Sequence, residues 1–202
     1  MASTEAGVRE ASEARCMRAD ARRNRERILE CAREAFAEYG PDAQMDDIAR
    51  RACVGVGTLY RHFETKDALV GELIQAKLSD LAGRTRRALE QEGDPWEIIA
   101  DLLRAQAEVM AADAAQQRMV FAATDGAIAR AEPALAELTA AMEALLERAR
   151  RTGAIRPDLT VDDIRTLMCG LGSVMAADAA GPMPYDWRRH LELFLEGVRA
   201  RS

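Results

Sequence analysis

Residues 53–63 read CVGVGTLYRHF, and this stretch decides the fold of the first third of the chain. Glycine is a poor helix former, yet Gly55 and Gly57 stand immediately before a segment in which Leu59 and Phe63 share helical spacing. A glycine can cap a helix, and a second one in the first turn leaves the backbone open to a phosphate or a base edge. The stretch therefore predicts a tight turn followed by a short helix with a functional outer face.

Two more helices are predicted before this stretch. The first is expected to begin at Arg22, and its apolar side chains recur every three or four residues until Gly40 and Pro41 stop the pattern. The second covers about 45–53 and opens with two aspartates, which the positive end of a helix dipole favours. Three short helices with a tight turn between the second and third form a helix-turn-helix.

The rest of the chain is predicted to be helical as well. Aromatic residues make up only 4% of the sequence, proline and glycine are few, and no alternating strand pattern is visible. Thr65 is expected to cap a long fourth helix, and Thr160 with Asp163 resembles a capping box. Further helices are expected near 95–112, 115–125, 132–152, 160–179 and 186–200, with breaks at Gly126, Glu132-Pro133, 153–157 and 181–184.

These elements predict an all-α protein with three regions. Residues 1–21 hold almost no large apolar side chains and are expected to form a mobile tail. The helix-turn-helix domain is expected over 22–68, and a second helical domain over 69–202.

Charge and cysteine content narrow the function classes. The formal charge is −6, yet residues 1–67 are nearly neutral and contain an arginine cluster, so positive charge is concentrated locally. The four cysteines lie far apart without a CxxC pair, which supports neither a metal site nor a disulfide framework. With no signal peptide or membrane span visible, we expect a cytoplasmic protein that has no contact with the membrane. No nucleophile elbow, phosphate loop or acid–base pair stands out, so we expect neither an enzyme nor a cofactor.

The outer face of the third predicted helix is suited to DNA. Once Leu59 and Phe63 point inward, a hydroxyl, a phenol, a guanidinium and an imidazole share the remaining surface, and all four can donate to phosphate. An exposed valine can also contact a thymine methyl group. The predicted DNA-binding residues are Arg22, Arg23, Arg25, Gln44, Val56, Gly57, Thr58, Tyr60, Arg61, His62 and Lys66.

The segments RERILECAREAFAEYG at 25–40 and IARRACVGVGTLYRHFETKDAL at 48–69 resemble the DNA-binding domain of the tetracycline-repressor (TetR) family. The resemblance covers about 24–72 and implies a transcriptional regulator that binds double-stranded operator DNA. Members of that family commonly have glycine at the position of Cys53 and serine or threonine at that of Gly55. Because Cys53 carries a side chain, its backbone is expected to avoid the left-handed conformation.

The resemblance also implies that helices five to seven of this chain enclose a pocket for a small-molecule effector. Methionine adapts to varied apolar ligands, although methionine at helical spacing is also typical of an ordinary core. The pocket candidates are Met110, Met119, Phe121, Met142, Leu145 and Met175. Because few polar candidates such as Gln106, Gln117 and Thr124 accompany them, the effector is expected to be largely apolar.

The resemblance further implies a homodimer whose interface is formed by the last two helices. Their apolar positions outnumber what one buried stripe requires, so a partner is expected. The interface candidates are Leu167, Leu171, Val174, Leu191, Phe194, Leu195 and Val198. The third predicted helix is the recognition helix, the one expected to enter the major groove of DNA. In a dimer, two recognition helices about 34–36 Å apart would read successive major grooves, which predicts a pseudo-palindromic operator. Repression is the expected output, although the family also contains activators.

A thiol-based switch is the alternative hypothesis. Cys53 stands beside the predicted recognition helix, where oxidation could block DNA binding. A free cysteine is more often a small buried hydrophobe, and no other cysteine is near it in sequence.

Overall fold

The computed structural model describes the backbone of residues 2–178 and 185–200, and the side chains of 20–113, 117–120, 122–175 and 185–200. In these residues the regular structure is helical apart from one isolated β-bridge between Ile155 and Arg199, which confirms the predicted all-α class. The helices are α1 (Ala2–Tyr39), a 3-10 turn η1 (Gly40–Asp42), α2 (Met45–Arg51), α3 (Val56–His62), α4 (Lys66–Glu90), α5 (Pro95–Ala112), α6 (Ala114–Phe121), α7 (Asp125–Arg151), α8 (Val161–Asp178) and α9 (Trp187–Val198).

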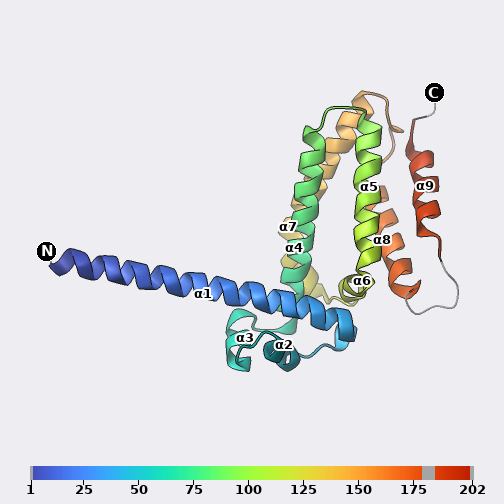
Figure 1. The fold of residues 1–202 in the computed structure, drawn as a ribbon. Coiled ribbons are helices and arrows are strands. Elements are labelled where there is room, and N and C mark those ends of the chain that lie inside the picture. The colour runs from blue at the N-terminus through green and yellow to red at the C-terminus, as the bar shows by residue number, and fades with distance from the viewer. Residues whose placement is uncertain (1, 179–184, 201–202) are drawn as a thin grey trace.

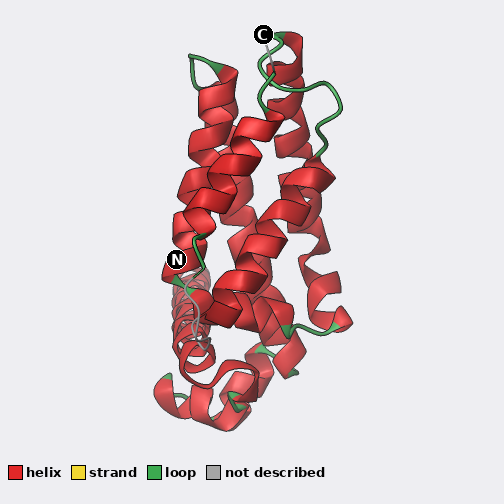
Figure 2. Cartoon of the chain, turned by 90° about the vertical axis from the view of Figure 1, so that its right-hand side faces the viewer, coloured by secondary structure: helices red, strands yellow, loops and turns green. Residues whose placement is uncertain are grey.

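The long helices stand upright in one bundle, and α1 runs across its lower end (Figure 1). Helices α2 and α3 lie beneath α1, while α8 and α9 flank the side of the bundle beyond α5. The view turned by 90° shows the same upright bundle above the small helices (Figure 2). None of the helices in the described part of the chain is both long and apolar enough to cross a bilayer.

Two hydrophobic cores are buried within this arrangement. The lower core joins α1, α2, α3 and the first turns of α4 and α7, and includes Ile28, Leu59 and Leu69. The upper core joins the end of α4 with α5, α7, α8 and α9, and includes Leu103 and Leu145. Because α4 and α7 contribute to both cores, they connect the two halves of the molecule.

Local sequence explains where several helices begin. Thr65 caps α4 by accepting a hydrogen bond from the Ala68 amide at 3.1 Å, as predicted. The Thr160 amide donates to Asp163 at 2.9 Å and the Asp163 amide donates back to the Thr160 hydroxyl at 3.2 Å, which confirms the capping box before α8. Gly40, with a φ of 59°, follows the last residue of α1, where a stop is predicted.

Three predicted boundaries differ in the structure. Helix α1 begins at Ala2, so residues 2–21 of the predicted tail are helical, since the many alanine, glutamate and arginine residues there are strong helix formers. Helix α7 runs through Gly126 and Pro133, so both predicted breaks there are wrong. Thr124 caps α7 instead, and the burial of Ala127, Ala131 and Ala134 favours a continuous helix despite the proline. The break predicted at 181–184 lies outside the described residues.

Helices α4 and α7 pack closely against each other at Gly71. A Cβ atom at this position would lie 2.8 Å from the Ala127 carbonyl oxygen and 2.9 Å from the Arg130 Cβ. Only a residue without a side chain permits this approach, because the obstructing atoms include backbone. The contact joins the two helices that both cores share.

The turn after α2 is closed by two hydrogen bonds. The Cys53 amide donates to the Arg50 carbonyl at 3.1 Å, and the Val54 amide donates to the Ala49 carbonyl at 3.0 Å. This pattern places the residue after the helix cap in the left-handed region, and Cys53 has a φ of 50°. The expectation that Cys53 avoids this conformation is therefore wrong, because the hydrogen bonds that end α2 require it.

The end of α7 shows the same turn with a glycine. The Gly153 amide donates to the Arg150 carbonyl and the Ala154 amide to the Ala149 carbonyl, both at 3.0 Å, and Gly153 has a φ of 67°. Among the described residues, Cys53 is the one non-glycine with a positive φ. The helix-turn-helix thus contains local strain that the equivalent turn after α7 lacks.

Replacing Cys53 by glycine is expected to stabilise the protein. The left-handed region costs an L-residue about 1–2 kcal/mol, and the greater freedom of glycine in the unfolded chain offsets about 0.5–1 kcal/mol of the gain. Urea unfolding should show that Cys53→Gly raises the free energy of unfolding by about 0.5–1 kcal/mol. Cys53→Ala keeps the Cβ and removes the thiol, so it should stay near wild type. Equal shifts for both variants would contradict this account.

Candidate nucleic-acid interface

The first turn of α3 is built as the two glycines predict. Gly55 is the N-cap, and its carbonyl accepts from the amides of Thr58 at 2.8 Å and Leu59 at 3.1 Å. Gly57 is exposed, and a Cβ built there would meet no atom within 4 Å. Leu59 is fully buried beneath this turn. The backbone at the start of α3 is therefore both rigid and open to a large partner.

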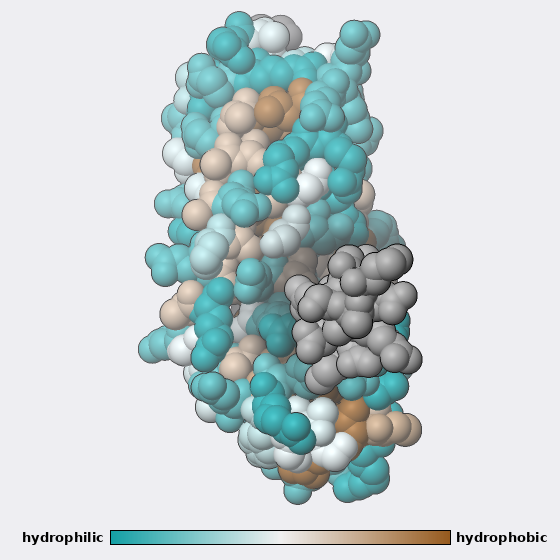
Figure 3. Space-filling model, turned by 90° about the vertical axis from the view of Figure 1, so that its left-hand side faces the viewer, coloured by the Kyte–Doolittle hydropathy of each residue, from teal (hydrophilic) through white to brown (hydrophobic). Residues whose placement is uncertain are grey.

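The outer face of α3 mixes apolar and polar side chains. Val56 and Tyr60, one helical turn apart, are 41% and 43% exposed. Arg61 is exposed as well, and donates from Nε to the Gly57 carbonyl at 3.1 Å and from Nη2 to the Thr58 hydroxyl at 3.3 Å. The lower end of the molecule accordingly shows hydrophilic and hydrophobic surface side by side (Figure 3). Thr58 and His62 are half-buried at the edges of this face.

Three further predicted DNA-binding residues lie on the surface. The side chains of Arg22 and Arg23 on α1 are 74% and 63% exposed, and each pairs with a carboxylate on its own helix, Glu26 at 3.6 Å and Asp20 respectively. Such exposed pairs are weak, so both guanidinium groups can turn to a phosphate. Gln44 is the exposed N-cap residue of α2, and its Nε2 donates to the Asp42 carbonyl at 2.7 Å.

Arg25 and Lys66, which we predict to contact DNA, make contacts within the chain in this structure. Arg25 forms a bidentate ion pair with Glu72, with Nε 2.8 Å from Oε1, and donates to the His62 carbonyl at 3.3 Å. Its guanidinium also lies 4.6 Å from the centre of the Phe63 ring. These contacts join α1 to α3 and α4, so Arg25 positions the recognition helix.

Lys66 joins two other elements in the same way. Its ammonium donates to the Pro41 carbonyl in η1 and lies 5.7 Å from the centre of the Phe36 ring.

Glu72, the partner of Arg25, is a residue that the sequence reasoning missed. The two lie 47 residues apart on different helices, and no local spacing signals that they meet.

The predicted pocket residues are distributed over both hydrophobic cores. Met110, Met142, Leu145 and Met175 are buried in the upper core, whereas Met119 is buried in the lower core. The side chain of Phe121 lies outside the described residues. Met119 is therefore buried in a different core from the other four, and a shared effector pocket stays a prediction.

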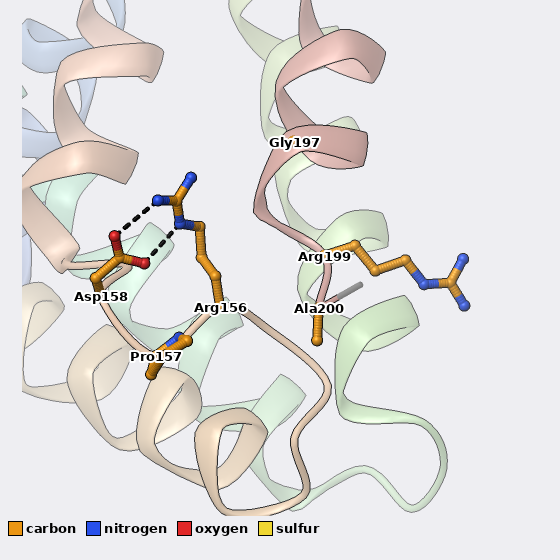
Figure 4. A pocket seen from close by; sticks show the side chains of 6 residues that line it. All are labelled: Arg156, Pro157, Asp158, Gly197, Arg199 and Ala200. Carbon is orange, nitrogen blue, oxygen red and sulfur yellow. Dashed lines mark hydrogen bonds and ion pairs between the residues drawn. The ribbon is translucent and has the colours of Figure 1, made fainter. Parts of the chain in front are cut away.

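Cavities occur elsewhere in the described part of the chain. One of about 490 Å³ opens beside the loop after α7 and the end of α9 (Figure 4). There Arg156 pairs with Asp158 through two contacts of 2.6 and 2.7 Å, which hold the pKa of the Asp158 carboxyl below its usual range. Arg199 points away from this pair (Figure 4). A second cavity, of about 210 Å³, lies between α1, α4 and α5.

Four of the seven predicted dimer residues lie inside the chain's own core. Leu171, Leu191, Leu195 and Val198 are buried there in the single chain and hold α8 and α9 on the bundle. Leu167, Val174 and Phe194 are only partly buried. Leu193, which the sequence reasoning did not select, is 55% exposed.

Ion pairs hold α9 against α5. Arg104 meets Glu192 with two contacts of 2.8 Å, which lower the pKa of the Glu192 carboxyl, and Arg188 meets Glu108 at 3.0 and 2.8 Å. Bidentate arginine–carboxylate pairs also fix orientation. The outward face of α9 is therefore set by contacts within the chain.

Comparisons with known proteins agree with this architecture. Residues 28–73 match the family "Bacterial regulatory proteins, tetR family", and residues 94–200 match "Transcriptional regulator SbtR-like, C-terminal domain". An HTH-type transcriptional regulator of Staphylococcus aureus is 46% identical over 63 residues, which are 31% of this chain and 34% of that protein. The chain thus spans about a third of the length of the curated relatives that it matches.

Two solved structures extend the likeness to nearly the whole chain. A TetR transcription regulatory protein from Mycobacterium vanbaalenii is 33% identical, with 91% of this chain and 99% of that chain covered and a TM-score of 0.62. The repressor FadR of Thermus thermophilus, solved with lauroyl-CoA, is 28% identical, with coverage of 88% and 96% and a TM-score of 0.62. On the matched residues of both halves and this near-complete likeness, the chain belongs to the TetR family of transcriptional regulators.

Proposed function

We propose that the protein is a homodimeric repressor that a small molecule releases from a pseudo-palindromic operator. The outer face of α3 carries this proposal. It combines an open backbone at Gly57 with exposed Val56 and Tyr60, on a helix that Arg25 fixes from behind. Binding to double-stranded operator DNA would take place in the cytoplasm.

The chemistry of this face suits both parts of a DNA site. Gly57, Thr58 and Arg61 form a polar row able to donate to phosphate, with His62 at its end. Tyr60 and Val56 form the neighbouring row, which suits base edges and thymine methyl groups in the major groove. Arg22 and Arg23, exposed on α1, would add phosphate contacts outside the groove.

The dimer would form through the outward faces of α8 and α9. Leu193 and Phe194 leave apolar surface on α9, and Val174 does so on α8. A two-fold pairing of these faces would place two copies of α3 side by side on the DNA. Inverted half-sites about one helical turn, or a multiple of it, apart would follow.

A small-molecule effector would act through the helices that both cores share. Thermus thermophilus FadR was solved with lauroyl-CoA, a ligand with a long apolar part, which supports a largely apolar effector here too. The methionine-containing upper core can rearrange around such a group. A tenfold loss of operator affinity needs about 1.4 kcal/mol of coupling, within the usual range of about 1–3 kcal/mol.

Tyr60 and Thr58 should carry much of the sequence-specific affinity. In a mobility-shift assay with the intergenic DNA that flanks the gene, the double variant Thr58→Ala, Tyr60→Ala should bind at least tenfold more weakly, which corresponds to about 1.4 kcal/mol or more. Thr139→Ala removes an exposed threonine from α7, far from α3 in the sequence, and should bind as wild type does. Unchanged specific binding by the double variant would refute the assigned interface.

Alanine substitutions at Arg22 and Arg25 should change different properties, namely the salt dependence of DNA binding and the free energy of unfolding. Arg22→Ala should lower the slope of log affinity against log salt by about 0.9 and leave stability unchanged, because it removes one phosphate contact. Arg25→Ala should lower the free energy of unfolding by about 1 kcal/mol, because it leaves Glu72 without its partner in a partly exposed site. If Arg25→Ala instead changes only the salt slope, Arg25 contacts DNA directly.

A thiol switch is the second candidate, because Cys53 is exposed at the turn that leads into α3. Burial, followed by the charge of Glu34, raises the pKa of the neighbouring Cys31 thiol, which lowers its thiolate fraction and its reactivity. Treatment with hydrogen peroxide should leave operator binding unchanged if the small-molecule mechanism holds. Peroxide-induced loss of binding that Cys53→Ala abolishes would favour the switch.

A further inference from the structure

The cavity of about 210 Å³ lies where the DNA-binding part of the chain meets the bundle. Arg33 of α1 forms one wall, Lys77 and Arg84 of α4 form another, and Gln106 of α5 contributes a buried amide. Of the three cations, Arg33 lies on α1, which packs in the lower core, whereas Lys77 and Arg84 lie on α4, which packs in both cores. The position is therefore one from which a bound group could influence both halves.

Positive charge predominates in the lining. Asp80 is the one carboxylate among the described lining residues, and its side chain pairs with Arg84 at 2.7 Å. Arg33 pairs with Glu30, one turn earlier on α1, across an exposed contact that is easily exchanged. The chain as a whole has a formal charge of −6, so the charge of this lining is opposite in sign to that of the chain.

Lys77 is the cation whose charge is least compensated. Burial lowers the pKa of its ammonium group, and the attraction of Asp113 restores only part of that loss. A desolvated ammonium gains more from a nearby anion than an exposed one does, because the local dielectric is lower. Lys77 is thus prepared for an anionic partner that enters the cavity.

The size and the remaining lining restrict that partner. A volume of about 210 Å³ is below the range of roughly 300–1,000 Å³ that whole drug-sized ligands occupy. Leu73 and the 41% exposed Val109 give the cavity an apolar side next to the cations. A small charged group attached to an apolar chain fits both features.

We propose that this cavity binds a carboxylate or phosphate group of the effector, held by Lys77 with Arg33 opposite. In naming the effector, the inference rests on the proposed function and adds a charged end to a ligand otherwise expected to be apolar. The anion would draw Arg33 of α1 toward Lys77 of α4. That movement would change how α1 and α4 pack and so reposition α3, which Arg25 and Glu72 connect to both helices.

The test uses the full chain without DNA and three probes in isothermal titration calorimetry. Octanoate offers a carboxylate with an apolar chain, octan-1-ol is its neutral counterpart, and inorganic phosphate is the second anion. Octanoate or phosphate should bind, the anion that binds should do so at least tenfold more tightly than octan-1-ol, and Lys77→Met should weaken its binding at least tenfold. Octanoate binding alone identifies a carboxylate, and phosphate binding alone identifies a phosphate.

Matched variants separate the cavity from general charge and from folding. Arg87→Met removes an exposed cation from the same helix outside the cavity and should bind the anion as wild type does. Lys77→Met keeps the unbranched stem and should be at least as thermally stable as wild type, because it removes a poorly compensated charge. Arg33→Gln, on the opposite wall, should weaken binding several-fold. Binding of neither anion, equal binding of octan-1-ol, or unchanged binding by Lys77→Met would overturn the proposal.

Operator binding without any probe tests the proposed function separately. If the wild type binds operator DNA, the anion that binds the cavity should weaken that complex in the wild type and not in Lys77→Met. An equal effect on both would overturn the assignment of the cavity to the effector. If the chain binds no specific DNA yet binds the anion through Lys77, the proposed function fails while the anion site stands.

Discussion

Helix α4 packs its first half among α1, α2 and α3 and its end among α5, α7, α8 and α9, and the rest of the structure depends on this shared position. Its N-terminal half also holds Glu72, which receives Arg25 from α1. Gly71, one residue earlier, permits a close approach of α7. A shift of α4 therefore cannot occur without moving either the recognition helix or the bundle.

The recognition helix gains its function from this support. Seven residues form too short a helix to be stable alone, so α3 must be held by tertiary contacts. Leu59 and Phe63 fasten it from inside, and Arg25 covers the Phe63 ring while binding the His62 carbonyl. Val56 and Tyr60 on the outer face are exposed and therefore available to contact DNA.

Strain in the same domain has a local cause. The turn after α2 requires a left-handed residue, and the chain supplies Cys53 where the equivalent turn after α7 has Gly153. The strain lies two residues before the Gly55 cap of α3. Cys53 therefore affects the stability of the domain, and Gly55, two residues later, sets where the recognition helix begins.

Sequence reasoning succeeded where neighbours in the chain decide the structure. The caps at Gly55, Thr65 and Thr160, and the burial of Leu59, follow from spacing and residue type alone. The predicted break at Pro133 failed because packing against α4 outweighs the local cost of proline in a helix.

The candidate site was predictable only in part, for the same reason. The outward position of Val56 and Tyr60 follows from helical periodicity once Leu59 is placed inside. Whether an arginine is free or engaged depends on partners far along the chain, as the 47 residues between Arg25 and Glu72 show. Methionine spacing likewise could not reveal that Met110 and Met119 belong to different cores.

Selection of binding sites from random double-stranded DNA tests the central claim most directly. The account predicts enrichment of one sequence with two inverted half-sites, whose centres lie about 10 base pairs or a multiple of that spacing apart. Footprinting should then show protection on one face of that duplex. Absence of any enriched sequence, or enrichment of a single half-site without an inverted repeat, would contradict a dimeric regulator that reads DNA through α3.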